Sequence, residues 1–463
     1  MKKAEHHANK RDCRDKGGVE LRSNRGEPSI APAYANGEDG REVSTVELLE
    51  KVLHRDNLNL AYKRVKKNGG SHGIDGMGVD ELLPYLQEHG ESIRERIREG
   101  KYKPEPVRRV EIPKPDGGVR LLGIPTVLDR MIQQAIAQVL TLIFEKEFSN
   151  HSYGFRPGRN AQQAIRQARA YINEGYKVVV DIDLEKFFDR VNHDKLMSLL
   201  SKRVADKRLL RLIRTYLEAG VMLGGLVSAT EEGTPQGGPL SPLLSNVMLH
   251  ELDKELERLG HRFCRYADDS NIYVRSMRAG QRVMAGISKY IEERLKLKVN
   301  RNKSAVDYPQ RRKFLGFSFY RKKEEIRVRI HPKPLKRFKD KVRAITSRSN
   351  AWNMEARIKK LNQAIQGWIG YFSMADMRGH CQTLDEWIRR RLRMCYWKQW
   401  KKIGTKHDNL VRLGLDDRNA WQYANTRKGY WHTSNSPILS TTLNNSYFRR
   451  LGYIGLLDVY GSL

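Results

Sequence analysis

The chain has 463 residues, of which 39% are hydrophobic and 30% charged, and this apolar content is sufficient for packed cores and argues against a globally disordered protein. Lys and Arg total 86 against 54 Asp and Glu, so the net charge of +32 favours a polyanionic partner. The length predicts roughly three domains. No uninterrupted run of about 18 apolar residues occurs, so we expect no membrane span and no membrane partner.

Cysteine usage and the N-terminus indicate a reducing compartment. The four cysteines, at positions 13, 264, 381 and 395, are too few in so long a chain for a disulfide scaffold, and the lack of a C-x-x-C pair argues against structural zinc. The first ten residues lack the apolar stretch of a secretory signal. We therefore expect a cytoplasmic protein.

The first hundred residues change from a polar tail to helices. Residues 1–43 are polar and rich in Gly and Asn, which predicts a flexible tail. Residues 44–100 show amphipathic helical spacing, interrupted by a glycine-containing loop at 68–73. This stretch is expected to extend the N-terminal side of the next domain.

Strand patterns follow. Residues 107–112 and 119–122 alternate around Asp-Gly, which predicts a β-hairpin, and 126–147 return to helical spacing. Residues 177–183 form a short apolar run that ends in acids, as in a buried strand whose end carries carboxylates.

A second helix and hairpin complete this region. Residues 240–258 place leucines and valines on one helical face. Strand patterns at 263–266 and 271–274 flank Ala267-Asp268-Asp269-Ser270, which predicts a hairpin with two acids at its tip.

The last third is basic and aromatic. Residues 331–400 contain 16 Lys and Arg against 5 Asp and Glu, with tryptophans interleaved at helical spacing. We place one domain boundary near residue 331 and another near 401, which gives domains at 44–330, 331–400 and 401–463. The charge excess exceeds what solubility alone requires.

The most informative residues are three acids on two predicted strands. Asp183 ends one strand, and Asp268 and Asp269 lie at the tip of the later hairpin. Neighbouring carboxylates repel each other unless a cation stabilises them. Mg²⁺ prefers such oxygen ligands, and two such ions can stabilise the attacking and leaving oxygens of phosphoryl transfer. We expect two Mg²⁺ ions, with Mn²⁺ as a substitute.

At these residues the chain resembles a group II intron-encoded reverse transcriptase/maturase. The matching blocks occur in the family's order over more than 200 residues. They are residues 109–114 (RVEIPK), 152–159 (SYGFRPGR), 183–189 (DLEKFFD), 234–242 (TPQGGPLSP), 266–269 (YADD), 298–303 (KVNRNK) and 314–317 (FLGF). The resemblance implies an α/β right-hand polymerase with fingers and palm, then an α-helical thumb and a small C-terminal domain that binds RNA or DNA.

The resemblance implies that Asp183, Asp268 and Asp269 are the catalytic metal ligands, with the Leu184 carbonyl as a backbone ligand. Two further acids compete with Asp183. Asp181 lies two residues earlier on the same strand face, and Asp189 follows two phenylalanines and is expected to be structural. Asp183 is preferred because its spacing to Phe188 fits the family pattern.

Other residues are implied in nucleotide and template binding. Arg108, Lys114 and Arg130 resemble residues that hold phosphates and template, with a solvated basic surface as the alternative. Phe188 would lie under the sugar and reject a 2′-hydroxyl, with an ordinary core aromatic as the alternative. Gln236 and Gly237 resemble the loop over the nascent base pair, where glycine permits close backbone approach.

The predicted helix around residue 390 carries four arginines and nearby tryptophans. Arg389, Arg390, Arg391 and Arg393 are candidates for RNA binding, because arginines neutralise phosphates and release counterions. Tryptophans can stack on unpaired bases. For Trp368 and Trp387, a role in the core of the helical domain is favoured.

The resemblance also implies the partners. They are group II intron RNA, an RNA template with a DNA primer, dNTPs and target DNA; a homodimer is compatible with the sequence, which does not reveal it. Residues 367–372 and 424–429 resemble the compact bacterial class C subgroup, and no endonuclease domain is expected. We expect a nucleoid-associated location in a bacterium. The alternatives are a maturase with a vestigial polymerase and a reverse transcriptase recruited to defence or repair.

Overall fold

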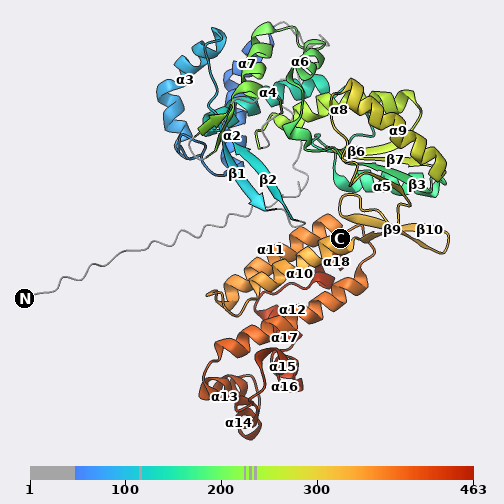
Figure 1. Ribbon diagram of the computed structural model, residues 1–463. Helices are drawn as coiled ribbons and strands as arrows, with labels where there is room; N and C mark the ends of the chain where they lie inside the picture. The colour runs from blue at the N-terminus through green and yellow to red at the C-terminus, as the bar shows by residue number, and fades with distance from the viewer. Residues whose placement is uncertain (1–46, 114–116, 224–225, 229–231, 234–236) are drawn as a thin grey trace, which may run out of the picture. The chain divides into compact units, whose positions relative to one another are not determined.

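The computed structural model describes residues 47–113, 117–223, 226–228, 232–233 and 237–463 (Figure 1). These residues form two compact units. The first contains the described residues up to 340 together with 374–380, and the second contains 341–373 and 381–463. The first unit is mixed α/β and the second is helical, which confirms the α/β class at this coarse level.

Helices open the first unit. They are α1 (Leu48–Leu53), α2 (Arg55–Asn68) and α3 (Leu82–Arg98), and α2 packs against α4 (Val127–Phe144). A buried polar pair joins α2 to α4. Asn57 donates to the Ala135 carbonyl oxygen at 3.1 Å, and Gln138 donates to the Asn57 side-chain oxygen at 2.6 Å. These bonds satisfy polar groups that burial would otherwise leave unpaired.

Helix α4 differs from the expectation that no segment is apolar enough to span a membrane. By length and composition alone it is apolar enough to cross a membrane, although its sequence contains Asp129 and Arg130. However, 72% of the helix is buried within the protein. Core helices pass the same test, so burial accounts for its composition.

An N-terminal sheet has the strand order β2-β1-β4-β5. The antiparallel pair β1 (Val107–Pro113) and β2 (Val119–Ile124) confirms the first predicted hairpin. Strand β4 (Val221–Leu223) pairs in parallel with β1, and β5 (Leu226–Ser228) pairs with β4.

A central sheet has the order β6-β7-β3-β8. Its strands are β6 (Arg262–Tyr266), β7 (Asp269–Val274), β3 (Val178–Ile182) and β8 (Ala305–Asp307). Strand β3 is hydrogen-bonded on both sides, which explains its apolar run. The strand at 177–183 and the second hairpin are therefore confirmed.

The two faces of the central sheet carry different helices (Figure 1). A Cβ at Gly280 of α9 (Met277–Arg294) would meet Val178, Val274 and Val306, so α9 covers the face to which these valines point. On the opposite face Tyr273 meets Tyr171 of α5 (Ala161–Asn173), with ring centroids 5.7 Å apart. Strand alternation puts Asp181 and the position of Asp183 on this second face.

Further elements complete the first unit. The predicted helix at 240–258 is α8 (Ser241–Arg258), whose predicted apolar face is buried. The others are α6 (His193–Ser201), α7 (Lys207–Glu218), a 3₁₀ turn at Phe187–Asp189, and the antiparallel pair β9 (Phe317–Lys322) and β10 (Glu325–Ile330).

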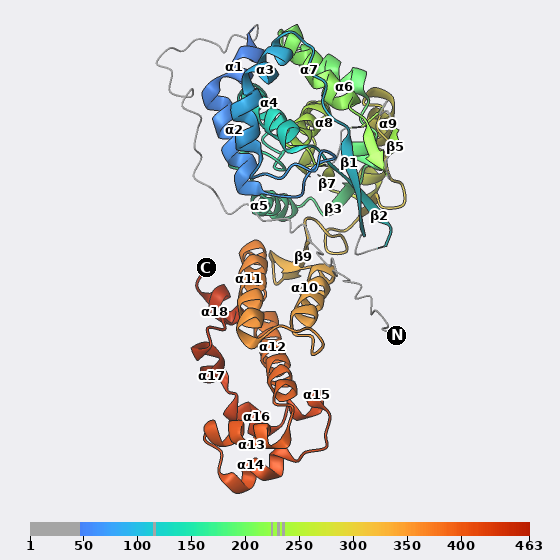
Figure 2. The same cartoon turned by 90° about the vertical axis from the view of Figure 1, so that its left-hand side faces the viewer.

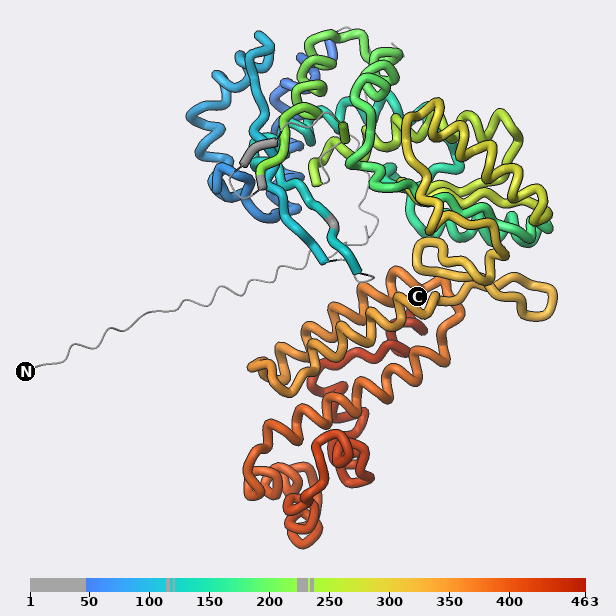
Figure 3. The backbone as a smooth tube through the Cα atoms, viewed as in Figure 1, coloured from blue at the N-terminus to red at the C-terminus, as the bar shows by residue number. Residues whose placement is uncertain are grey.

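The second unit is built around long helices, which Figures 2 and 3 follow along the chain. Helix α10 (Pro332–Ile345) leads into it. The helices that follow are α11 (Met354–Phe372), α12 (Arg378–Gln399), α13 (Ile403–Arg412), α14 (Asp417–Ala424), α15 (Tyr430–Thr433), α16 (Pro437–Thr442), α17 (Asn445–Arg450) and α18 (Leu456–Gly461). Trp397 and Trp400 are buried, so these two tryptophans belong to the core. Trp368 and Trp387 are only half-buried.

The C-terminal segment is fastened to α12 by one buried carboxylate. Asp385 accepts hydrogen bonds from the Tyr453 hydroxyl at 3.0 Å and from the backbone amides of Leu456 and Leu457 at 2.8 and 2.9 Å. Asn362 of α11 adds a bond to the Gly452 carbonyl oxygen at 2.7 Å. The last turn is therefore part of the packed helical unit.

Candidate active site

The central sheet brings the predicted acids together at one end of its strands. In the antiparallel pairing of β3 with β7, Asp181 faces Asn271 and Ile182 faces Ser270. One step further along both strands, Asp183 comes opposite Asp269. The charges of Asp181, Asp183 and Asp268 all act on the Asp269 carboxyl group, which shows that the four acids share one site.

A tight hairpin presents the acid pair. Tyr266 of β6 pairs with Asp269 of β7, which leaves Ala267 and Asp268 as a two-residue loop. Ala267 has a φ of +57°, in the left-handed region that residues other than glycine rarely adopt. Strain of this kind clusters at functional sites.

The site holds excess negative charge. Asp269 is exposed, yet the surrounding protein removes part of its hydration, and this desolvation is the largest cause that raises the pKa of Asp269 to about 7. The negative charges of Asp268, Asp181 and Asp183 raise this pKa further, and the positive charge of Lys313 opposes them. Carboxylates crowded in this way favour a bound cation.

The structure distinguishes the three acids near residue 183. Arg312 donates to the Asp181 carboxylate through Nη2 at 2.6 Å and Nε at 3.0 Å, so this acid already has a cationic partner. Asp189 is exposed in the 3₁₀ turn. Within the described residues, no side chain forms a hydrogen bond or ion pair with the Asp183 carboxylate. Asp183 is therefore more available to a cation than Asp181.

The backbone next to Asp183 is firmly held. The Asp183 carbonyl oxygen accepts a hydrogen bond from the Asn300 amide at 2.8 Å, and the Glu185 amide donates to the Lys298 carbonyl oxygen at 2.8 Å. Leu184 pairs with Val299 between these two bonds, and its own carbonyl takes no part in them. That carbonyl remains available as a backbone ligand.

The donor set suits a divalent ion whose remaining ligands come from elsewhere. Among the residues that the structure describes, no three His, Cys, Asp or Glu side chains form a ready-made metal site. Mg²⁺ commonly binds through one or two carboxylates and completes its shell with water and substrate phosphates. The unpaired Asp183 carboxylate and the crowded Asp268–Asp269 pair fit this mode of binding.

The two described arginines of the predicted nucleotide site are bonded to a loop. Arg108 donates to the His72 carbonyl oxygen at 2.8 Å. Arg130 donates to the carbonyl oxygens of Gly69 at 3.2 Å and Ser71 at 2.8 Å. Both arginines therefore fasten the 69–73 loop, a structural role that the sequence analysis missed.

The other predicted nucleotide-binding residues divide into two groups. Lys114 and Gln236 lie outside the described residues. Gly237 has a φ of +126°, and a Cβ there would overlap the Gly123 carbonyl oxygen, so only glycine suits this approach to β2. Phe188 is half-buried, packs against the core and meets Phe187 edge-on at 5.1 Å. Both the core and the sugar-contact interpretations of Phe188 are compatible with this position.

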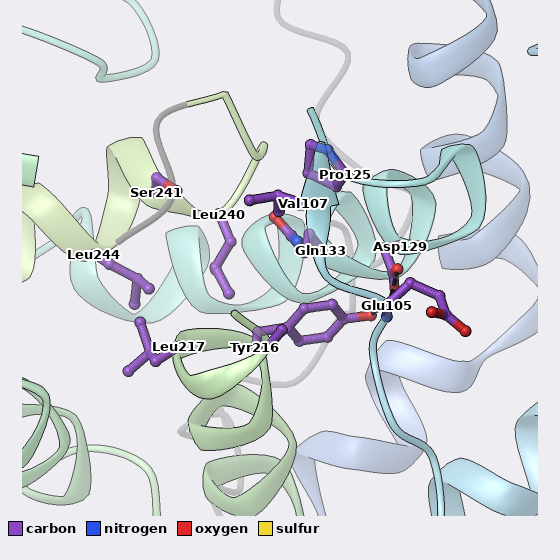
Figure 4. A pocket seen from close by; sticks show the side chains of 11 residues that line it. Glu105, Val107, Pro125, Asp129, Gln133, Tyr216, Leu217, Leu240, Ser241 and Leu244 are labelled. Atoms are coloured by element: carbon purple, nitrogen blue, oxygen red, sulfur yellow. Dashed lines mark hydrogen bonds between the residues drawn. The ribbon is translucent and has the colours of Figure 1, made fainter. Parts of the chain in front are cut away.

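Beneath the N-terminal sheet lies a small pocket lined by a buried acid (Figure 4). Asp129 accepts hydrogen bonds from the hydroxyls of Tyr102 at 2.7 Å, Thr126 at 2.7 Å and Tyr216 at 3.1 Å. Burial is the largest effect on its pKa, which lies above the usual value of a carboxyl group. The cluster ties α4, α7 and the segment before β1 together, so it supports the first unit, and none of the four acids lines the pocket.

In the second unit, three of the four predicted RNA-binding arginines are bonded to the protein. Arg391 donates to the Thr346 side chain, and Arg393 donates to the Leu443 carbonyl oxygen at 3.0 Å. Arg390 donates to the Trp431 carbonyl oxygen at 3.1 Å and lies over its ring at 3.9 Å. For Arg389 no such bond occurs within the described residues.

Arg312 and Lys313 are site residues that sequence reasoning missed. Arg312 neutralises Asp181, and the charge of Lys313 acts on both Asp181 and Asp269. The only available signal was their place just before the 314–317 block, because Arg312 and Asp181 are 131 positions apart.

Two protein-family models match the chain. One, described as reverse transcriptase (RNA-dependent DNA polymerase), matches residues 112–319. The other, described as the maturase-specific domain of group II introns, matches residues 335–414. The first range contains the four acids, and the second contains the four arginines of α12.

Curated relatives agree with these matches. Protein YkfC of Escherichia coli (strain K12) is 31% identical over 301 residues, which cover 56% of this chain and 79% of YkfC. Group II intron-encoded protein LtrA of Lactococcus lactis subsp. cremoris is 34% identical over 231 residues, 50% of this chain and 38% of LtrA. An uncharacterized 91 kDa protein in the cob intron of Schizosaccharomyces pombe is 35% identical over 219 residues, 46% of this chain and 26% of that protein. The chain thus spans well under half the length of the last two relatives.

Proposed function

This chain belongs to the group II intron reverse transcriptase/maturase family, and on that premise we propose that it copies intron RNA into DNA during retrohoming and also binds that RNA as a maturase to promote splicing. The reverse transcriptase domain makes it an RNA-dependent DNA polymerase. The observation that carries the proposal is the meeting of Asp183 with Asp268 and Asp269 at one end of the central sheet, inside the matched polymerase region.

The polymerase family implies a divalent metal, and we propose two Mg²⁺ ions, with Mn²⁺ as a substitute. When bound, the ions would stabilise the attacking primer 3′-hydroxyl and the leaving pyrophosphate. Asp183, Asp268, Asp269 and the Leu184 carbonyl would hold them. The excess negative charge at Asp269 supports this assignment, because it is unfavourable until a cation binds.

The other chain residues would place the substrates. Arg108, Lys114 and Arg130 would lie on the side of the nucleotide phosphates and template, and Phe188 would lie against the sugar. Gln236 and Gly237 would border the nascent base pair. The close approach of Gly237 to the Gly123 carbonyl oxygen supports a crowded position at this glycine.

In this proposal residues 44–330 form the fingers and palm of a right-hand polymerase, 331–400 form a thumb, and 401–463 form a nucleic-acid-binding domain. The blocks at 367–372 and 424–429 support a class C-like subgroup, and the lack of an endonuclease stays a prediction. The partners would be intron RNA, a template–primer pair, dNTPs and target DNA, at the nucleoid of a bacterium. The net charge of +32 supports a polyanionic partner.

Primer extension tests the polymerase activity. The purified chain is given an RNA template, a DNA primer, dNTPs and Mg²⁺, and we expect extension that Asp268→Ala abolishes. Asp189→Asn is the matched control and should retain most of the activity, because this exposed acid has no place in the proposed site. Extension that survives Asp268→Ala contradicts the assignment of the site.

A splicing assay tests the maturase activity. Intron RNA from the flanking DNA is incubated with the chain at a Mg²⁺ concentration too low for self-splicing, and we expect the chain to promote splicing. Robust splicing without any DNA synthesis would favour a maturase with a vestigial polymerase. Flanking DNA without intron RNA structure would favour a role in defence or repair.

A further inference from the structure

A buried arginine lies beside the turn that carries Asp268 and Asp269. Arg265 of β6 and Asp253 of α8 are both inaccessible to solvent and form a bidentate ion pair, with distances of 2.7 Å from Nε to Oδ1 and 2.6 Å from Nη2 to Oδ2. A pair buried so deeply is a weak source of stability, because desolvation offsets the attraction. Positional specificity is the role that such a pair can serve.

The remaining guanidinium nitrogen of Arg265 holds the turn itself. Its Nη1 donates to the Ala267 carbonyl oxygen at 3.0 Å and to the Asn246 side-chain oxygen at 3.0 Å. Ala267 is the residue with the left-handed backbone, and its carbonyl precedes Asp268. Arg265 therefore fixes an unfavourable backbone conformation at the point from which the acid pair projects.

The other side of the turn is braced by the segment around residue 152. The Asn246 side chain donates to the Gly154 carbonyl oxygen at 2.9 Å, and the Arg265 amide donates to the His151 carbonyl oxygen at 2.9 Å. A Cβ at Gly154 would overlap the Ala267 backbone nitrogen. The turn thus has little room to move on either side.

We infer that Arg265 is a positioning residue that aims Asp268 and Asp269 for divalent metal binding, acting through the Ala267 carbonyl and held in place by Asp253. The inference rests on the proposed function, since it concerns the same acids. It assigns a role to a residue that no substrate or metal needs to touch. Residues that orient metal ligands in this way commonly influence metal affinity strongly.

Direct metal binding tests the inference on the full-length chain. Mn²⁺ is the probe, and its free concentration is followed by electron paramagnetic resonance. We expect Arg265→Lys and Asp253→Asn to weaken Mn²⁺ binding about tenfold to a hundredfold. The Mg²⁺ concentration for half-maximal primer extension should rise in parallel, while the affinity for template–primer, measured by fluorescence anisotropy, stays near the wild-type value.

The matched control is Arg258→Gln. Arg258 also lies on α8 and forms an ion pair with Glu255 at 2.7 Å, but this pair is largely solvent-exposed on the Arg258 side. Its loss should leave Mn²⁺ binding unchanged. If Arg265→Lys and Asp253→Asn do not fold, Asn246→Ala keeps the ion pair and removes one brace, and it should weaken Mn²⁺ binding roughly threefold.

Circular dichroism identifies the variants that are folded. Folded variants with wild-type Mn²⁺ affinity would overturn the inference, as would a wild-type chain that binds no Mn²⁺. A wild-type chain that binds Mn²⁺ but extends no primer would contradict the polymerase proposal instead. In that case the loss of Mn²⁺ binding in the variants still supports the positioning role.

Discussion

The acids of the central sheet and the arginines of α12 are both clusters of like charge, but they differ in the partners that the fold provides for their side chains. The Asp183 carboxylate has no hydrogen-bond or ion-pair partner among the described residues, and the pKa of Asp269 is raised to about 7 by desolvation and neighbouring negative charge. Arg391 and Arg393, by contrast, are bonded to groups of their own unit. The unpaired Asp183 carboxylate and the raised pKa of Asp269 indicate a binding site, whereas the hydrogen bonds of Arg391 and Arg393 give these two arginines a structural role.

The largest expected effect comes from exchanging one acid at a time at the end of β3, where Asp181 lies in the strand and Asp183 follows it. Asp183→Asn should reduce primer extension about a thousandfold or more, because it removes a metal ligand at the reacting phosphate. Asp181→Asn should retain far more activity, since Asp181 is already paired with Arg312. Initial rates at saturating nucleotide provide the measurement. A larger loss in Asp181→Asn, at unchanged melting temperature, would reverse the assignment.

The next effect concerns pH. Asp269 has a pKa of about 7 without metal, so its carboxyl group gains a proton as the pH falls through 7 and must lose it when a metal binds. At limiting Mg²⁺ we expect the extension rate to fall up to about tenfold per pH unit below 7. Saturating Mg²⁺ should restore much of that rate. Equal half-saturating Mg²⁺ concentrations above and below pH 7 would show that this carboxyl group is not a ligand.

Substitutions of the α12 arginines should have smaller effects, on folding stability and RNA affinity. Arg391→Ala removes bonds to Thr346, so it should lower the free energy of unfolding by about 1–3 kcal/mol. Arg389→Ala is the matched variant and should leave stability unchanged while weakening RNA binding a few fold. Thermal melting and filter binding to intron RNA separate the two. If both variants lose RNA affinity equally and keep the same stability, both arginines bind RNA.

The smallest effect is a gain in stability. The folded-state pKa of Asp269 lies above its usual value of 3.8, so the folded protein binds this proton more tightly than the unfolded chain does. The resulting stabilisation is fully present below about pH 4 and is lost as the pH rises through 7. Without metal at about pH 8, Asp269→Asn should therefore raise the melting temperature by about 1–2 °C, after allowance for solvent screening of an exposed group. The gain should shrink near pH 5. A lower melting temperature at both pH values would contradict the charge repulsion argument.

Local patterns predicted the elements well. The strand at 177–183, the helix at 240–258 and both hairpins follow from periodicity and turn residues that lie within a few positions of each other. The proximity of Asp183 to Asp269 required the family resemblance in addition, because pairing between distant strands has no local signal. The apolar composition of α4 was underestimated, because Asp129 and Arg130 interrupt a helix that is otherwise buried.

The partners of charged side chains could not be predicted. A basic pattern does not reveal whether a guanidinium group meets solvent, phosphate or a backbone carbonyl. Arg108 and Arg130 bond to a loop some 36 and 59–61 positions away, and Arg265 pairs with Asp253 on another element. Such contacts depend on tertiary packing between distant segments, which local sequence patterns do not reveal.

The hydrogen bonds that the C-terminal segment donates to Asp385 have a consequence for truncated forms of the chain. A premature stop codon ahead of Tyr453 would remove three donors from a carboxylate that is 4% exposed, and it would remove α18, which packs against α11. Leaving a buried charge without its donors costs several kcal/mol. A chain that stops before Tyr453 should therefore lose much of the stability of its helical unit, although every residue of the first unit is still present.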